Sequence, residues 1–521
     1  MVHSIQETDV AFAPLFSHLG GLADRHADAL AVVHGKRRTR YGELNARINR
    51  IANALVEMGL RKGEKVALLS TTCLEMLECM YAVQKAGGVL VPLSPLFTRE
   101  TLHMILEDSD SVGVVYGRGL ASIVDEPGAR HPVLRPELCI TLDEAETSGQ
   151  TSYQQIMERY APQDPGVEVS EDDLSAIVYT SGTTGHPKGV VHCHGHRTGF
   201  AMATCLAWEV SIDSTVLIST PLYHNAAASL LLPALLVGGT AVLMEGMDPE
   251  GWLETVQGER ITHTVLVPTQ FVSLMGCPEF HSYDLSSLEI VISTGAPMTR
   301  KTKEDVLAHF PRGVSEVYGL TEGIATILEP SDFVRKAGSV GKPASAGDIR
   351  VVDEDFNDVP PGEIGEVVGF NPGWGGYYKQ PELTARTDID GWLRTGDLGR
   401  LDDEGFLYLV GRKKDLIVSG GMNIYPEDIE DVLLRHPNVL EACVFGIPHP
   451  KWGESPMAAV ILKEDARTTE DEIIAWTNAR VAGYQKIRGV SLTADFPRNS
   501  TGKVLKRQLR QPYWEDHEEK I

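Results

Sequence analysis

A run of hydroxyl side chains, glycines and one lysine, residues 179–189, carries the densest chemistry in this sequence. Residues 176–179 at its start are apolar and predict a short buried strand. Glycine lets a backbone approach an anion closely, hydroxyl groups donate to phosphate oxygens, and lysine adds positive charge. The spacing is not that of a Walker A loop, because Thr183 and Pro187 stand where that motif needs glycine. The run therefore predicts a loop over the phosphates of a nucleotide, with a polar surface turn as the alternative.

Further motifs follow this loop along the chain, at residues 221–226, 293–297, 316–322, 391–397 with 411–415, and 497–503. Taken singly, their residues have plain structural interpretations. Asp397 is typical of a cap and Arg412 of a surface ion pair. Lys503 is typical of a solvated lysine, and His224 of a buried core histidine. Only the order and joint spacing of the whole set favour a functional interpretation.

In this order the six motifs closely resemble the adenylate-forming superfamily, which includes acyl-CoA ligases, luciferases and the adenylation domains of peptide synthetases. The likeness runs from about residue 20 to residue 512, and the branch that it indicates is the AMP-forming acyl-CoA synthetases. The resemblance implies ATP, Mg²⁺ and coenzyme A, and a reaction in two steps. A carboxylate attacks the α-phosphate of ATP to give an acyl-adenylate and pyrophosphate, and a thiol then displaces AMP. Since two anions must meet, positioning and positive charge are expected to do most of the work.

The resemblance also implies roles for single residues. Lys503 would bridge the attacking carboxylate and the α-phosphate, and Thr321 would donate to that phosphate. Glu322, together with Thr184, would hold Mg²⁺, which prefers oxygen ligands. His224 would lie where the acyl pocket meets the thiol tunnel. The catalytic residues implied are Lys503, His224, Thr321 and Glu322.

The nucleotide is expected to contact a larger set of residues. Tyr318 would stack on adenine, and Asp397, assisted by Arg412, would accept hydrogen bonds from the ribose hydroxyls. In full, the residues implied for binding ATP or coenzyme A are Thr180, Ser181, Gly182, Thr183, Thr184, Gly185, Lys188, Gly295, Ala296, Pro297, Glu316, Val317, Tyr318, Gly319, Asp397, Arg412, Gly420 and Gly421.

Three histidines, His192, His194 and His196, alternate with glycine and with Cys193 just after the phosphate loop. Four such side chains could bind zinc. At strand spacing, however, the histidines share one face and Cys193 lies on the other, so a closed tetrahedral site is disfavoured. The family also has a histidine here without a metal.

Length, charge and cysteine content narrow the class of protein. With 521 residues, at least two domains are expected. A formal net charge of −25 disfavours nucleic acid and anionic membranes as partners. The seven cysteines form no C-x-x-C pair, and neither a secretory signal nor a membrane-spanning run is recognised. A cytoplasmic enzyme is therefore expected, and a homodimer is left open.

The elements that must position these motifs alternate between strand and helix patterns. Helices are expected at 41–58, 74–85, 226–236, 249–256, 270–275 and 301–309, and strands at 65–70, 88–92, 111–116, 215–218, 240–244, 263–267 and 288–293. Repeated strand–helix units predict an α/β protein with mostly parallel sheets covered by helices on both faces.

The pattern changes after about residue 336. The glycine-rich sequence at about 338–410, with its short alternating strand patterns, predicts a small β-barrel or a distorted sheet. The last hundred residues have helices and strands of their own and predict a small α+β domain. The predicted division is an adenylation domain at 1–413 and a lid domain at 414–521.

In the family the last domain is a mobile lid, and Lys414 falls at its hinge. One orientation would bring Lys503 to the nucleotide, and the other would present Gly420 and Gly421 to the thiol tunnel. Residues 484–487 depart from the Tyr-Lys-x-Pro segment of many members, because they keep the tyrosine but lack lysine and proline in register. This departure concerns contacts to the thiol cofactor and not the adenylation chemistry.

The acid itself is read from four segments that would line its pocket, 224–230, 267–271, 293–295 and 318–326. None of them contains arginine or lysine, so an apolar acid, medium-chain aliphatic or alicyclic/aromatic, fits better than a dicarboxylate. The neutral residues after His224 disfavour an amino acid, whose ammonium group would need a partner. The alternatives are an enzyme that loads a carrier protein, a luciferase-like oxygenase and a non-catalytic nucleotide-binding protein.

Overall fold

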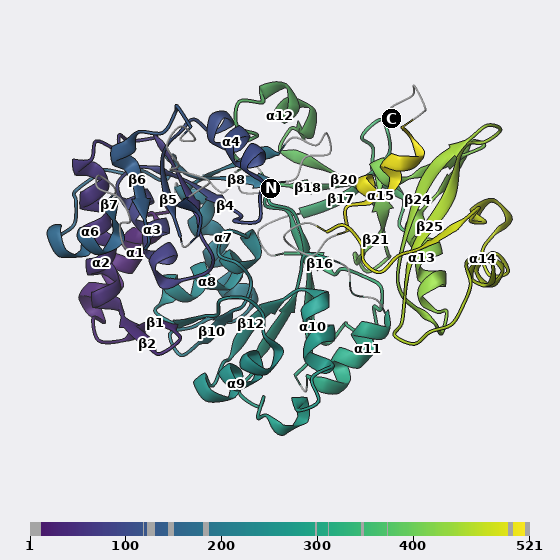
Figure 1. Ribbon diagram of the computed structural model, residues 1–521, viewed down its shortest axis with the longest axis horizontal. Coiled ribbons are helices and arrows are strands. Elements are labelled where there is room, and N and C mark those ends of the chain that lie inside the picture. The colour runs from purple at the N-terminus through teal and green to yellow at the C-terminus, as the bar shows by residue number, and fades with distance from the viewer. Residues whose placement is uncertain are drawn as a thin grey trace, which may run out of the picture.

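The computed structural model describes residues 12–117, 119–121, 131–143, 151–180, 187–296, 298, 300–310, 312–344, 348–371, 374–498 and 504–515. Within these residues the strands form four sheets, of nine, seven, five and five strands. The two large sheets and their helices make up one part of the molecule, and the C-terminal sheet lies at its other end (Figure 1).

The seven-stranded sheet has the order β7-β6-β5-β3-β4-β8-β9. Every neighbouring pair is parallel except β8 and β9, which form an antiparallel hairpin. The strands are β3 (Lys65–Leu69), β4 (Val89–Leu93), β5 (Ser111–Tyr116), β6 (Cys139–Thr141), β7 (Thr151–Ser152), β8 (Leu174–Thr180) and β9 (Lys188–Cys193). The helices of this part are α2 (Tyr41–Glu57), α3 (Leu74–Lys85), α4 (Arg99–Asp108), α6 (Tyr153–Arg159) and α7 (His194–Ala207).

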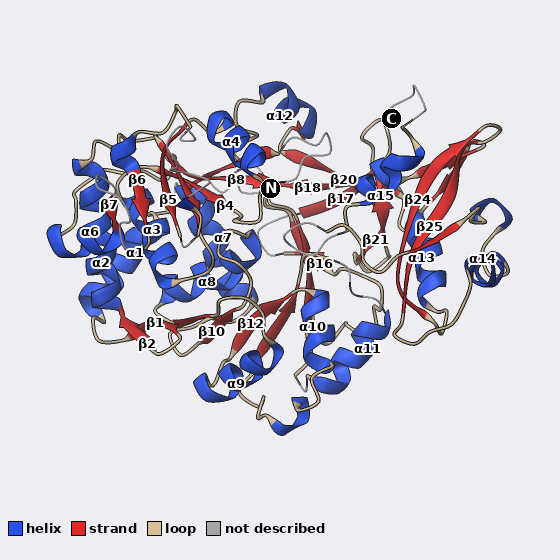
Figure 2. Cartoon of the chain, viewed as in Figure 1, coloured by secondary structure: helices blue, strands red, loops and turns tan. Residues whose placement is uncertain are grey.

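The nine-stranded sheet has the order β16-β15-β14-β13-β12-β10-β11-β1-β2, parallel from β14 to β1 and antiparallel at both edges. Its strands are β1 (Leu30–His34), β2 (Arg37–Arg40), β10 (Thr215–Ile218), β11 (Thr240–Leu243), β12 (His263–Leu266), β13 (Ile290–Ser293), β14 (Ser315–Gly319), β15 (Ala325–Leu328) and β16 (Lys342–Pro343). Its helices are α1 (Leu15–Arg25), α8 (Asn225–Val237), α9 (Pro249–Glu259), α10 (Pro268–Met275) and α11 (Arg300–His309). The predicted parallel α/β architecture is confirmed (Figure 2).

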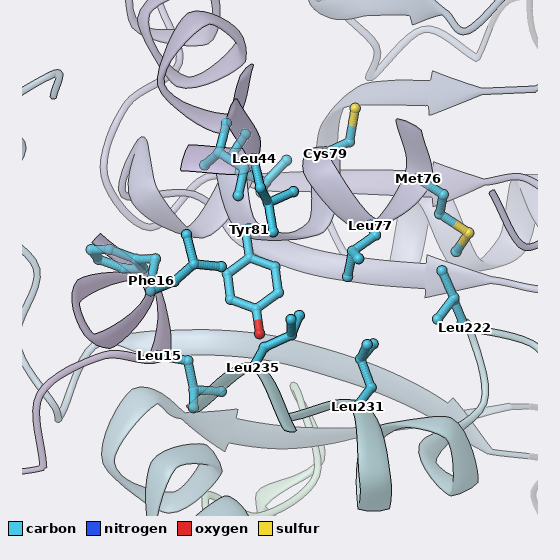
Figure 3. Close-up of a cluster of buried hydrophobic side chains, with 14 of the residues drawn as sticks. Leu15, Phe16, Leu44, Met76, Leu77, Cys79, Tyr81, Leu222, Leu231 and Leu235 are labelled. Atoms are coloured by element: carbon cyan, nitrogen blue, oxygen red, sulfur yellow. The ribbon is translucent and has the colours of Figure 1, made fainter. Parts of the chain in front are cut away.

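The largest core cluster lies between α3 and α8, where the two large sheets meet. Figure 3 shows Leu77 and Tyr81 of α3 directed toward Leu231 and Leu235 of α8. Each of these side chains is at most 3% exposed, and burying one leucine contributes about 1.5–3 kcal/mol to folding. Helix α8 is apolar on most of its surface, as expected of a helix covered on both sides. This contact fixes the two sheets relative to each other.

The glycine-rich region forms an antiparallel sheet of β17 (Asp348–Val352), β18 (Gly365–Phe370), β19 (Asp388–Ile389), β20 (Trp392–Leu401) and β21 (Leu407–Arg412). Helix α12 (Pro381–Thr387) precedes β19. Of the two forms that the sequence predicts, barrel or distorted sheet, the described residues adopt the sheet, since β17 and β21 do not pair with each other.

The C-terminal part has its own sheet, in the order β23-β22-β25-β24 with β26 beside β25. The strands are β22 (Ile417–Ser419), β23 (Met422–Ile424), β24 (Val439–His449), β25 (Gly453–Leu462) and β26 (Val490–Leu492). The helices are α13 (Pro426–Leu434), α14 (Glu470–Asn478) and α15 (Lys506–Arg510). A separate core forms between this sheet and α13. A short 3₁₀ turn at Lys413–Asp415 connects β21 to this unit, and its role as a hinge stays a prediction.

Two further sequence expectations can be compared with the fold. No helix in the described ranges is long and apolar enough to cross a membrane. All seven cysteines are free thiols, three of them buried and four partly exposed.

Candidate active site

The hairpin of β8 and β9 holds both ends of the predicted phosphate loop. Thr180 and Lys188 lie opposite each other in its register. The hydroxyl of Thr180 is buried and has no hydrogen-bond partner among the described residues. The remaining loop residues of the predicted site, Ser181, Gly182, Thr183, Thr184 and Gly185, lie outside the described residues, as do Pro297 and Lys503.

Lys188 and Glu322 meet beside this hairpin. The Nζ atom of Lys188 lies 3.1 Å from Oε1 of Glu322 and donates to the hydroxyl of Tyr377 at 2.5 Å. The Tyr377 hydroxyl in turn donates to the same Glu322 oxygen at 2.6 Å. Burial, and then the charge of Glu322, raise the pKa of Tyr377, so its hydroxyl keeps its proton. The three groups form a closed polar triangle, and Tyr377 is not among the site residues predicted from the sequence.

The carboxylate of Glu322 can serve as the Mg²⁺ ligand predicted from the sequence. The residue is 8% exposed. Within the described part of the chain only its Oε1 atom accepts hydrogen bonds from side chains, which leaves Oε2 for a hard cation. Its backbone carbonyl accepts from Asn371 Nδ2 at 2.7 Å, which fixes the turn that carries it. The donor set therefore fits Mg²⁺, and Thr184, the other predicted ligand, lies outside the described residues.

A second polar cluster joins Tyr318, Asp397 and Arg412. The hydroxyl of Tyr318 donates to Oδ2 of Asp397 at 2.7 Å, and Nε of Arg412 lies 2.9 Å from Oδ1. Asp397 is 4% exposed and faces Arg412 across the β20–β21 pair. Burial, and then Asp397, hold the pKa of Tyr318 well above its usual value. The structure brings these three predicted residues together.

The two clusters are neighbours because Tyr318 lies near the end of β14 and Glu322 lies in the turn that follows this strand. This turn is tight. The N–H of Leu320 donates to the Ile324 carbonyl, and a Cβ on Gly319 would lie 2.8 Å from that same oxygen. Thr321, the predicted α-phosphate donor, occupies the turn. The first part of the motif at 316–322, residues 316–319, belongs to β14 itself.

Glu316 also lies in β14, and its side chain contacts other protein groups and not the space predicted for the nucleotide. Its carboxylate is 2% exposed, forms an ion pair with Lys303 of α11 and accepts the N–H of Met298 at 3.1 Å. A nucleotide contact would therefore involve its backbone. The neighbouring Val317 carbonyl accepts from Thr294 at 3.2 Å.

The loop after β13 that carries Gly295 and Ala296 is thereby tied to β14. Gly295 adopts a φ of +87°, which favours glycine. Gly295 and Ala296 are both exposed, as a wall for adenine would have to be.

His224 caps the N-terminus of α8. Its Nδ1 atom accepts the N–H of Ala226 at 3.2 Å, and burial lowers its pKa, so the ring is neutral. His224 also lines a cavity shared with Arg197 of α7. Arg197 lies outside the four segments from which the acid pocket was predicted, so it is not among the predicted site residues. Its proximity to Asn225 is a tertiary contact that no local spacing indicates.

The histidine cluster differs from its predicted arrangement. Cys193 ends β9 and caps α7 through its sulfur, so His194 and His196 lie on a helix and do not continue the strand. His192 and His196 stack with ring centres 5.3 Å apart, and burial lowers the pKa of His196 to about 4. No group of three metal-ligating side chains is found among the residues described here.

The predicted coenzyme A contacts lie on the C-terminal sheet. Gly420 and Gly421 form the two-residue turn between β22 and β23, with φ of +60° and +82°. Two left-handed residues in such a turn are typical of type I′ hairpins. A Cβ on Gly420 would lie 2.7 Å from the ring of Trp452.

Comparison with known proteins gives matches along most of the chain. A family described as AMP-binding enzyme matches residues 22–378, and AMP-binding enzyme C-terminal domain matches residues 428–503. Feruloyl-CoA synthase of an Amycolatopsis species is 35% identical and covers 93% of this chain and 96% of its own. Long-chain-fatty-acid–CoA ligase FadD13 of Mycobacterium tuberculosis is 34% identical over 91% and 93% of the two chains.

A solved structure shares the fold. It is o-succinylbenzoate CoA synthetase from Bacillus subtilis in complex with the acyl-adenylate intermediate OSB-AMP. It superimposes with a TM-score of 0.84 at 29% identity and covers 95% of this chain and 98% of its own.

Proposed function

The chain belongs to the AMP-binding enzyme family, in its acyl-CoA synthetase branch, and we propose that it joins an acid of apolar skeleton to coenzyme A. The enzyme is an AMP-forming acid–thiol ligase that acts on a carboxylic acid, ATP and coenzyme A. The proposed acids are medium-chain aliphatic, alicyclic or aromatic. Relatives named for ferulic and fatty acids support this choice, as does the absence of arginine and lysine from the four segments predicted to line the acid pocket.

One observation carries the proposed nucleotide site: the two polar clusters meet at the end of β14. A nucleotide that spans them would place its phosphates near Lys188 and Glu322, beside the β8–β9 hairpin. Its ribose would lie at Asp397, in competition with the Tyr318 hydroxyl, and its adenine against the ring of Tyr318. Cationic and hydroxyl donors held in advance by the fold lower the barrier to attack by an anion.

The remaining roles rest on the resemblance. Thr321 would donate to the α-phosphate, and His224, neutral and fixed as a cap, would stand at the entrance to the acid pocket. Mg²⁺, when bound, supplies positive charge at the phosphate oxygens, and Glu322 with Thr184 would hold it. Lys503 would stabilise the charge between the carboxylate and the α-phosphate. The lid domain would begin at Lys414 and bring Lys503 or Gly420 and Gly421 to the site in turn.

A panel of carboxylic acids tests the proposal directly. Pyrophosphate release is measured with ATP and Mg²⁺ for aliphatic, alicyclic and aromatic acids, with and without coenzyme A, and acyl-CoA is followed by mass. We expect acyl-CoA to accumulate with at least one acid of apolar skeleton.

Two outcomes would contradict the proposal. Pyrophosphate release without any acyl-CoA product would indicate a carrier protein or another acceptor in place of coenzyme A. Turnover confined to short polar acids would exclude the apolar skeleton.

A further inference from the structure

A small cavity lies between α3, α7 and α8, next to His224, and has a volume of about 30 Å³. Most of its lining is apolar, for example Met80, Leu222 and Leu231. The lining also contains the polar residues Gln84, Tyr223, His224 and Asn225, and of the described residues that line the cavity Arg197 is the one with a full charge. Tyr81 adds a hydroxyl that can donate a hydrogen bond. A cavity of this size holds one or two waters or a single small polar group, and not a whole acid.

Arg197 is positively charged, and no carboxylate among the described residues forms an ion pair with it. Among the residues described, its one hydrogen bond runs from Nη1 to the neutral Oδ1 of Asn225 at 2.8 Å. Removal from water lowers the pKa of Arg197 to about 10, so at neutral pH the guanidinium is still charged. A charge taken out of water is costly unless an anion or several acceptors compensate it. The remaining N–H groups of Arg197 are thus available to a ligand.

Tyr81 supplies a second donor to the same cavity. The residue is 3% exposed, and its hydroxyl has no hydrogen-bond partner in the ranges that the structure describes. In Figure 3 this hydroxyl points from α3 toward Leu231 and Leu235 of α8. Buried tyrosine hydroxyls ordinarily find a partner, so this one also indicates a site for an acceptor.

The cavity is separate from the turn that carries Glu322. His196, the residue before Arg197 in α7, faces that turn, since its Nε2 would lie 3.1 Å from a Cβ on Gly323. Consecutive helical residues point about 100° apart, and Arg197 instead reaches Asn225. An acid whose reacting carboxylate lies near Glu322 would therefore reach the cavity only with its other end.

We propose that Arg197 and Tyr81 form a specificity subsite that receives an oxygen-bearing group at the far end of the acid, for which a second carboxylate is the best match. A carboxylate has two acceptor oxygens, one for the guanidinium fork and one for the hydroxyl. The apolar lining favours an acid whose skeleton is apolar. This inference rests on the proposed function. Because Arg197 lies outside the four segments from which the acid pocket was predicted, the inference revises the expectation that an apolar acid fits better than a dicarboxylate.

Matched acids test the subsite. Octanoate, 7-oxooctanoate and octanedioate share one skeleton, and so do cinnamate, 4-methoxycinnamate and 4-carboxycinnamate. Within the series that the wild type accepts, we expect kcat/KM of the best oxygen-bearing acid to exceed that of its apolar parent about tenfold or more, mainly through a lower KM. The parent acid is disfavoured because it leaves the donors of Arg197 and Tyr81 without a partner.

Variants show whether this preference comes from the subsite. Arg197→Met should bring the ratio of kcat/KM between oxygen-bearing acid and parent close to one, and Arg197→Lys should keep part of it. Tyr81→Phe, which removes only the hydroxyl, should lower the ratio several-fold and gives an answer even if Arg197→Met does not fold. The matched control is Arg159→Met on α6, an exposed arginine that should leave the ratio unchanged.

Several results would overturn the inference. These are a wild type without preference for the oxygen-bearing acids, ratios unaltered in both Arg197→Met and Tyr81→Phe, or equal losses on all acids. Equal losses would mean a structural role or a contact to the reacting carboxylate. If no acid is turned over, the proposed function fails, and the subsite is then tested by measuring the binding of octanedioate by calorimetry. Octanedioate must then bind the wild type more tightly than Arg197→Met, and equal or absent binding refutes it.

Discussion

The ammonium group of Lys188 lies 3.1 Å from the carboxylate of Glu322, although 134 residues separate them along the chain. The contact joins the start of β9 in the seven-stranded sheet to the turn after β14 in the nine-stranded sheet. Both groups belong to the predicted phosphate and metal site. The same pair thus connects the two sheets and supplies the charges that an incoming triphosphate would meet.

Replacing Glu322 with Gln tests the metal ligand. The amide keeps the shape but loses the charge, so acyl-adenylate formation should fall about 100-fold or more, measured by pyrophosphate release across a Mg²⁺ titration. Tyr377→Phe is the control, because it removes one hydrogen bond to Glu322 and keeps the carboxylate; its loss should be much smaller. Rates for Glu322→Gln within threefold of the wild type would exclude the metal role.

Asp397→Asn tests the ribose contact. An amide accepts hydrogen bonds more weakly than a carboxylate, so the KM for ATP should rise about tenfold or more. Tyr318→Phe should have a smaller effect, since the ring remains and Oδ2 of Asp397 becomes available to the sugar. Steady-state kinetics in ATP decide this prediction. A larger effect of Tyr318→Phe than of Asp397→Asn would assign the sugar contact to the tyrosine.

Lys503→Ala separates the two half-reactions. The lysine is needed only while charge develops at the α-phosphate, so adenylate formation should be abolished. Thioester formation from supplied acyl-adenylate should remain largely intact. Lys463→Ala, at an exposed lysine of the same domain, is the control and should leave both half-reactions unchanged. Equal loss of both half-reactions would argue against the moving-lid assignment.

Lys414→Pro tests the hinge within the turn at Lys413–Asp415. Proline fixes φ near −65°, so it should slow thioester formation more than adenylation if the lid must rotate between the two steps. Lys414→Ala removes the charge and keeps the backbone free, and it should affect both steps equally. Quenched-flow measurement of each step distinguishes the cases. Unchanged kinetics in Lys414→Pro would remove residue 414 from the hinge role.

His194 predicts a dependence of stability on pH. The residue is 3% exposed, and burial lowers its pKa to about 4. Between about pH 6.5 and pH 4, His194 is protonated in the unfolded chain but not in the folded chain. The free energy of unfolding therefore falls as the pH falls through this window. The loss is on the order of 3 kcal/mol at its full extent.

Thermal unfolding between pH 7.5 and pH 4.5 measures this effect. His194→Gln should have a lower Tm at pH 7.5, because the ring contact to Phe16 is lost, but a shallower decline toward acid pH. A decline as steep as that of the wild type would assign the acid sensitivity to other groups.

Local pattern was sufficient for several of the elements, whereas the site residues were named from the resemblance that the motifs carry. The helix predicted at 74–85 and the strand at 215–218 agree with α3 and β10 residue by residue. Both have clear periodicity and end at capping or turn residues. Asp397 and Arg412 were also found as parts of motifs, and their pairing across β20 and β21 follows from the antiparallel register.

The remaining features depend on tertiary contacts. Tyr377 reaches Glu322 because an isolated bridge to Val190 places it beside β9, and nothing in the glycine-rich text around it indicates that bridge. Arg197 was not predicted because it lies outside the four segments taken to line the acid pocket, and its contact with Asn225 arises where α7 packs against α8. The expected strand through His194 and His196 failed because the sulfur of Cys193 caps α7 at that point.

Arg412 is at once the partner of Asp397 and the residue that precedes the turn leading to the C-terminal domain. Only Lys413 lies between Arg412 and Lys414, so these two residues are at most about 7 Å apart along the extended chain. Loss of the nucleotide would leave Asp397 to Arg412 and Tyr318, as in the present structure. If Lys414 is the hinge, as predicted, the pivot of the C-terminal domain lies next to the predicted ribose contact, and occupancy of that contact would bear directly on the rotation.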